Sequence, residues 1–207
     1  MSNYLALATV SATVGRVVGE ALEQIANPSG IPRVRFGPPQ VDAQYVGCTI
    51  FLYRVVTNPY RRNDDLPLRN DGGGFVKRPR ATLDADYLFT FAGEEATLEP
   101  QRFLGSVVSA LQAQPFLARD AIRRTIAASS YLKGSDLDAQ IDHIRLTPHG
   151  IDQQTMGQLW MSFPQVPYNV SVVYTASAIL LDAQVTPLEI PEVTEVDVTV
   201  EPSMVQP

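Results

Sequence analysis

The feature that most constrains the fold is a run of β-branched and aromatic residues, VGCTIFLYRVV, at positions 46–56. Apolar side chains occupy both alternating faces of this run, which is typical of a central strand covered on each side. A second strand-like run, ATLDADYLFTFA, follows at 81–92. Its apolar face comprises Leu83, Ala85, Tyr87, Phe89 and Phe91, and its polar face comprises Thr82, Asp84, Asp86 and Thr90. We therefore predict that one face of this second strand begins in contact with solvent.

Helical spacing of apolar residues recurs along the chain. Apolar residues at three- and four-residue spacing predict a helix over about 5–26. A second helix is predicted to follow Thr97, its candidate N-cap, and to end before Pro115. Shorter helices are predicted over 118–128 and after Asp152, which is also a candidate N-cap.

Three further strands are predicted at 31–36, 143–148 and 168–182. Together these elements indicate an α+β fold, with a mostly antiparallel four- to five-stranded sheet and three or four helices packed on it. We expect residues 1–182 to form one domain. Residues 183–207, which contain four prolines and alternating VTEVDVTV, are expected to form an acidic arm that could add as a strand to a neighbouring sheet edge.

The negative charge is concentrated in this arm. The chain has a net charge of −6, and residues 183–207 contain five acidic residues and no basic ones. Residues 1–182 are close to neutral, with 17 acidic and 16 basic residues. Nucleic-acid binding requires a concentrated basic surface, so we expect no nucleic-acid partner.

Neither apolar segment of the chain predicts a membrane anchor. The N-terminal stretch has no basic residue before its apolar part, so we expect an amphipathic helix in place of a signal peptide. The uncharged run at 153–181 is interrupted by Gln and Pro residues and is more typical of a buried helix and strand than of a membrane span.

The residue types that carry most enzyme chemistry are sparse. Cys48 is the single cysteine and is expected in the core, so neither an intrachain disulfide nor a cysteine-based zinc site is available. His143 and His149 make a poor metal pair, and no nucleophile motif accompanies them. Glu94, Glu95 and Glu99 are interpreted as acids at a helix start. We predict no catalytic residue, no cofactor and no metal.

A long polar connection lies between the first two strand-like runs. Residues 54–80 contain seven basic and three acidic residues, which is typical either of a solvated loop with internal ion pairs or of a docking surface for an acidic partner. Its Gly72 to Gly74 stretch raises a phosphate-binding alternative, but no Ser or Thr follows Lys77 and a strand, not a helix, comes next. The candidate interface residues are Arg61, Arg62, Asn63, Asp64, Asp65, Leu66, Arg69, Lys77 and Arg78.

Four segments together resemble the tail-terminator, or cap, family of extracellular contractile injection systems, which are phage-tail-like particles. These segments are MSNYLALATVSATV, IFLYRVVTNPYRRNDDLPLR, LDADYLFTFAGEEATLEPQRFLGSVVSAL and LWMSFPQVPYNVSVVYTASAILLD, spanning 1–182. The resemblance implies a phage tail-terminator-like fold and a non-enzymatic protein. It also implies a homohexameric ring on the distal end of the particle, where the ring ends the inner tube and anchors the last sheath layer.

This resemblance implies the inner-tube protein and the sheath protein as partners, without membrane insertion. It also implies assembly in the bacterial cytoplasm, within a particle that is later released or anchored. Among the family's motifs, only RRNDDLP at 61–67 is a candidate to be carried over to this chain as a contact surface. Two alternatives remain open: a phage tail-completion or connector protein, and a small-ligand or nucleotide-binding module that uses the glycine-rich loop.

Overall fold

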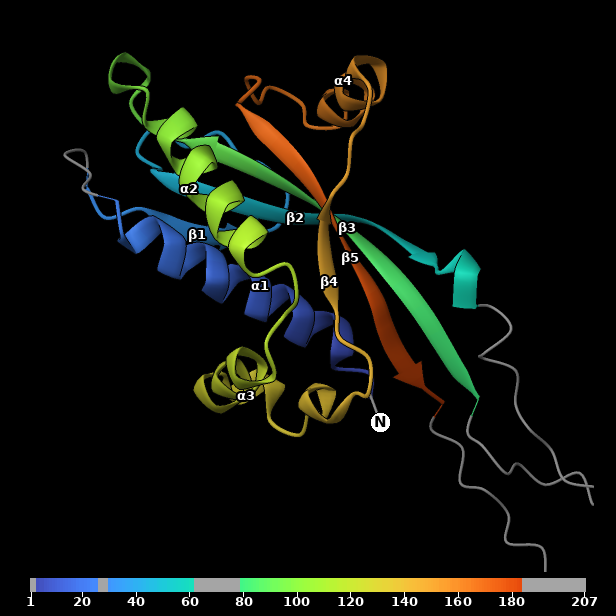
Figure 1. Cartoon of the computed structure of the whole chain (residues 1–207). Helices are drawn as coiled ribbons and strands as arrows, with labels where there is room; N and C mark the ends of the chain where they lie inside the picture. Colours follow the sequence, from blue (N-terminus) through green and yellow to red (C-terminus); the bar gives the residue numbers. More distant parts are fainter. Residues whose placement is uncertain (1–2, 26–29, 62–78, 184–207) are drawn as a thin grey trace, which may run out of the picture.

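The computed structural model describes residues 3–25, 30–61 and 79–183. These residues form one five-stranded sheet in the order β1-β2-β3-β5-β4, together with four α-helices (Figure 1). The elements are α1 (Ala6–Glu23), β1 (Arg33–Phe36), β2 (Gly47–Thr57), β3 (Arg80–Ala92), α2 (Glu99–Ala113), α3 (Arg119–Ala128), β4 (Arg145–Pro148), α4 (Gln153–Met161) and β5 (Ser171–Asp182). The predicted α+β class is confirmed.

The sheet is antiparallel except at one edge. β1 pairs with β2 in parallel, whereas the β2–β3, β3–β5 and β4–β5 pairs are antiparallel. Helices α1 and α2 cover one face of the sheet, and α4 lies by its other face (Figure 1). The two longest strands, β3 and β5, lie in the interior of the sheet and contribute side chains to the core.

The two faces of the sheet contribute to two separate hydrophobic clusters. The larger cluster joins α1 and α2 to the odd-numbered side chains of β3, including Tyr87 and Phe89. Cys48 belongs to it and is fully buried, as predicted. The smaller cluster packs Trp160 and Phe163 of the α4 region against Leu88 of β3. Each cluster therefore holds a different set of elements against the same sheet.

The predicted solvent-facing side of 81–92 is wrong. Thr82, Asp86 and Thr90 are 1%, 2% and 4% exposed. Thr175 of β5 and Arg54 of β2 donate hydrogen bonds to the Asp86 carboxylate. These bonds take the place of bonds to water, so the carboxylate can be buried. Alternation alone does not distinguish a wet polar face from a buried polar face that has partners.

The predicted helix caps differ in their outcome. Asp152 caps α4 as predicted, because its Oδ1 accepts a hydrogen bond from the Thr155 amide at 2.7 Å. Thr97 is not the N-cap of α2; that position belongs to Leu98, whose φ of 55° lies in the left-handed region. The Thr97 hydroxyl instead donates to the carbonyl of Glu94 within a short 3-10 turn.

None of the helices within the described ranges is long and apolar enough to cross a membrane.

Candidate assembly surface

Ion pairs anchor both ends of the polar connection. Arg61, at the end of a short 3-10 helix over Pro59–Arg61, forms a two-pronged pair with Asp142. Arg80, the first residue of β3, binds Asp182 of β5 at 2.6 Å. The Asp142 pKa is lowered, mainly by the hydrogen bond from Arg61. The connection therefore begins and ends at points fixed by the C-terminal half of the domain.

A third basic residue of this region, Arg54, is held by a buried acid. Its Nε lies 2.6 Å from Asp86, and the Arg54 side chain is 51% exposed while that of Asp86 is 2% exposed. Thr175 donates a hydrogen bond to the other carboxylate oxygen, and its hydroxyl lies 3.3 Å from His149 Nδ1. The charge of Arg54 is thus largely balanced inside the chain.

These pairs change how the basic connection is interpreted. Of its seven basic residues, three lie in the described part of the chain, and all three bind an aspartate of the same domain: Arg54, Arg61 and Arg80. At these three positions the internal ion-pair alternative holds. Of the nine candidate interface residues only Arg61 is described, and the other eight, together with Gly72 to Gly74, lie outside the described residues.

A different surface lies at the edge of the sheet formed by β1 and β2. β1 covers β2 only from Gly47 to Ile50, and the last contact is the Gly37 amide, which donates to the Ile50 carbonyl at 3.1 Å. β2 continues to Thr57 while remaining paired with β3 on its other side. Among the described residues, no strand pairs with the outer edge of β2 over residues 51–57. This stretch is called the open edge.

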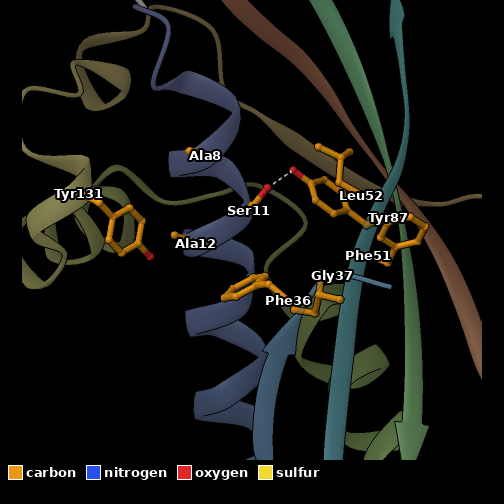
Figure 2. Close-up of a pocket in the computed structure, with 10 residues that line it drawn as sticks. Ala8, Ser11, Ala12, Phe36, Gly37, Phe51, Leu52, Tyr87 and Tyr131 are labelled. Carbon is orange, nitrogen blue, oxygen red and sulfur yellow. Dashed lines mark hydrogen bonds between the residues drawn. The ribbon is translucent and has the colours of Figure 1, made fainter. Parts of the chain in front are cut away.

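An apolar groove of about 400 Å³ lies beside the start of the open edge (Figure 2). Ala8 and Ala12 of α1 line the groove on the helix side, and Leu52 of β2 and Tyr87 of β3 line it on the sheet side. The exposed Phe36 and Tyr131 rings complete the lining, together with Ser11, Gly37, Ile50 and Phe51. An apolar hollow next to unpaired backbone is typical of a strand-binding site.

Two small residues of α1 and one tyrosine determine the shape of the groove. Gly15 lets the Phe36 ring lie against α1, because a Cβ at this position would collide with the ring. The Tyr87 hydroxyl lies 2.9 Å from Ser11 Oγ on the groove floor (Figure 2). Burial raises the pKa of Tyr87 to about 12, so this hydroxyl stays protonated at neutral pH.

The opposite edge of the sheet is closed by other parts of the chain. The segment before α3 covers β4, because the Leu146 amide donates to the Pro115 carbonyl at 2.7 Å and the Leu117 amide donates to Ile144. Beyond β4, the buried Gln140 side chain closes β5: its Nε2 donates to the Ala178 carbonyl and its Oε1 accepts from the Leu180 amide. Backbone and side-chain groups of other segments thus occupy these positions on the β4 side, whereas β2 is open over residues 51–57.

The open edge and its groove were missed by the sequence analysis, although a signal was present. The predicted strand at 31–36 is much shorter than the predicted strand at 46–56, and the structure pairs the two at the edge of the sheet. Such a difference in length predicts that part of the longer strand stays unpaired.

No group of three or more His, Cys, Asp or Glu side chains in the described part of the chain could hold a metal ion.

Comparison with known families connects this fold to one family. The family described as the Pvc16 N-terminal domain matches residues 9–195. A search of curated proteins found no match.

Two solved structures share the fold. One is the PVC sheath/tube terminator of an extracellular contractile injection system in its extended state, with 17% identity and a TM-score of 0.59. The alignment covers 93% of this chain and 63% of that terminator. The other is the tube-terminating cap of the anti-feeding prophage, with 18% identity and a TM-score of 0.58, over 91% of this chain and 61% of that cap. The chain therefore spans about six-tenths of the length of each matched structure.

Proposed function

The chain belongs to the Pvc16 N-terminal domain family, and we propose that it works as the tube and sheath terminator, or cap, of a contractile injection particle. In this role it forms a six-fold ring on the distal end of the particle. The ring ends the inner tube and holds the last sheath layer to it. The function is structural and requires no catalysis.

The observation that supports this proposal is the shared fold with two tube-terminating structures over nine-tenths of the chain. The asymmetry of the sheet also fits the role. A terminator has to bind its neighbours while leaving no matching edge for a further subunit. The sheet described above has a closed edge at β4 and an open edge at β2, and this difference could serve both requirements.

The proposed partners are other copies of this chain, the inner-tube protein and the sheath protein. Assembly takes place in the bacterial cytoplasm before the particle is released or anchored. The basic residues outside the described ranges, namely Arg62, Arg69, Lys77 and Arg78, are candidates for these contacts because Arg54, Arg61 and Arg80 are already paired.

Electron microscopy of particles from cells that lack this protein tests the proposal. Without a terminator, polymerisation has no fixed end, so we expect tubes and sheaths of widely varying length. Expression of the full chain in the same cells should restore uniform particles. Particles of unchanged length and composition in the deleted strain would contradict the proposal. Negative-stain images of the purified protein should also contain six-fold rings.

A further inference from the structure

The open edge of β2 and the groove beside it have no occupant among the described residues. We propose that the valine-rich stretch at 193–201 of a neighbouring copy adds as a strand to this edge and places its valines along the groove. The inference rests on the proposed ring, because it identifies the contact that joins one subunit to the next. The backbone, the two faces of the edge and the sequence of the arm each support it.

The backbone of β2 is already prepared for a further strand. Residues 51–57 are in extended conformation and are paired with β3 through residues 83–88. The amides and carbonyls of these residues that point away from β3 face the space beyond Phe36, where β1 ends. A strand in this position would continue the sheet in line with β1 and would satisfy these groups by main-chain hydrogen bonds.

The two faces of the open edge differ in chemistry. Leu52 and Val55 lie opposite Tyr87 and Ala85 of the larger core cluster, so they are on the α1 side of the sheet. Val55 is 41% exposed and extends the apolar surface beyond the groove. Arg54 lies opposite Asp86, on the other face. An added strand would therefore meet an apolar surface on one face and a guanidinium on the other.

The stretch at 193–201 has the matching alternation. Val196, Val198 and Val200 share one face, and they alternate with acidic residues and a threonine: Glu195, Asp197, Thr199 and Glu201. With the valines toward α1, the acidic residues would lie on the face that carries Arg54. The exposed part of the Arg54 guanidinium could then bind a second carboxylate in addition to Asp86.

The length of the linker permits a neighbouring copy to supply the arm, and the proposed ring is what favours that copy over the chain's own arm. The arm leaves from Ala183, next to the end of β5, and β3 and β2 separate this point from the open edge. An added strand would lie three strand spacings from β5, or about 14 Å. The nine residues at 184–192 include Pro187 and Pro191, which favour extended backbone, and would span about 28 Å. The arm therefore has about twice the length needed to reach its own edge, which leaves enough chain to reach an adjacent subunit of the proposed ring.

Such an exchange produces a directional contact. The donor, an arm beyond β5, and the acceptor, the edge of β2, are different surfaces of one chain. Contacts of this kind are head-to-tail and close into a ring when the rotation between subunits permits it. On the opposite side of the described sheet, the segment before α3 and the Gln140 side chain occupy the corresponding positions along β4 and β5.

Disulfide trapping in the full chain tests the inference. Val55→Cys is combined in turn with Val196→Cys, Val198→Cys and Val200→Cys, and the variants are oxidised mildly both as isolated protein and in purified particles. Cys48 is fully buried and its pKa is raised by that burial, so it should not compete. We expect a ladder of linked chains from at least one combination. Thr147→Cys on β4 with the same arm cysteines is the matched control and should give none.

Each other outcome would overturn the inference. Linking that is no stronger than in the Thr147→Cys control would show that the arm does not bind this edge. A link within one chain would identify the chain's own arm as the occupant, and a link to the tube or sheath protein would identify a different partner. The same gels show whether the protein is present in particles, so failure of the cap function is distinguished from failure of the arm contact.

Discussion

The Ala183 amide donates a hydrogen bond to the Pro79 carbonyl at 2.8 Å. Pro79 is the residue at which the polar connection returns to the sheet, and Ala183 is the residue at which the C-terminal arm leaves it. The bond therefore joins the roots of these two segments. The adjacent Arg80 and Asp182 form an ion pair at 2.6 Å, so the junction is held twice. Two segments that are about a hundred residues apart in sequence therefore emerge from one corner of the domain (Figure 1).

This shared corner has a consequence for assembly. The polar connection returns to the sheet at Pro79 and the arm leaves it at Ala183, so the roots of the two segments lie side by side. The proposed arm exchange and the proposed contacts of the connection can thus belong to one ring interface.

Removal of Arg54 should cost more stability than removal of its partner Asp86. Arg54→Leu leaves a buried carboxylate with Thr175 as its remaining hydrogen-bond donor, and we expect a loss of about 3 kcal/mol. Asp86→Asn keeps a hydrogen-bonding group and leaves Arg54 half exposed to water, so we expect a loss of about 1 kcal/mol. The double variant should resemble Asp86→Asn alone. Urea denaturation of all three variants gives these values, and a double variant less stable than Arg54→Leu would contradict this account.

The Arg61–Asp142 pair should make stability depend on pH. Its hydrogen bond from Arg61 lowers the Asp142 pKa below the usual value of 3.8 in the folded state. The pair therefore stabilises the fold above that pH, and the stabilisation is lost as the pH falls through the folded-state pKa. Because both side chains are about one-third exposed, we expect Asp142→Asn to cost no more than about 1 kcal/mol near neutral pH.

Unfolding free energies of the wild type and Asp142→Asn, measured from neutral pH down to about pH 2, test this prediction. The two curves should converge at the acidic end. Asp120→Asn is the matched control, because Asp120 is 85% exposed and lies 3.6 Å from Arg123. A constant difference between wild type and Asp142→Asn over the whole range would show that the loss comes from packing instead of charge.

Gln140 should be important for the closed side of the sheet. Its side chain is 3% exposed and binds both the Ala178 carbonyl and the Leu180 amide of β5. Gln140→Leu leaves the buried Leu180 amide and the partly buried Ala178 carbonyl without these bonds, so we expect a loss of about 1 to 3 kcal/mol in thermal or urea unfolding. Gln154→Leu, at an exposed position of α4, should change stability by no more than about 0.5 kcal/mol. Equal effects of the two substitutions would contradict the role of Gln140.

Local sequence patterns were sufficient to predict most elements of the fold. The spacing of apolar residues places α1, and β-branched runs place β2 and β5, because these signals depend only on near neighbours. Asp152 was predictable as a cap for the same reason, since its partner, Thr155, is three residues away. These predictions required no knowledge of tertiary contacts.

Features that depend on distant partners could not be predicted in this way. Asp86 is buried because Thr175, 89 residues later, completes its hydrogen bonding. Arg61 is paired because Asp142, 81 residues later, lies beside it. Counting charges within the connection overstates its basic character, because the compensating acids belong to other segments. The open edge likewise follows from where β1 ends relative to β2 in space.

Two glycines with similar backbone angles should respond differently to alanine. Gly47 and Gly37 have φ of 137° and 111°, which side chains rarely adopt. A Cβ at Gly47 would also collide with the Arg33 backbone, whereas none of the described atoms lies within 4 Å of one at Gly37. We expect Gly37→Ala to cost about 1 kcal/mol and Gly47→Ala at least about 3 kcal/mol, measured by urea denaturation. Equal losses would show that backbone strain alone governs both sites.

Charge reversal in the connection should separate assembly from folding. Arg61→Glu places two acids together at Asp142, so we expect lower stability and poor incorporation into particles. Arg62→Glu with Arg69→Glu changes candidate contact residues that lie outside the described ranges. This double variant should unfold like the wild type and still fail to enter particles, because rim charges govern association more than folding.

Thermal unfolding of the purified variants and immunoblots of purified particles test this difference. Arg62→Lys with Arg69→Lys keeps the charges and is the matched control, which should enter particles at the wild-type level. Normal incorporation of the Arg62→Glu and Arg69→Glu variant would remove these two residues from the proposed interface. The proposed arm exchange at β2 would be unaffected by that result, since it requires neither of these side chains.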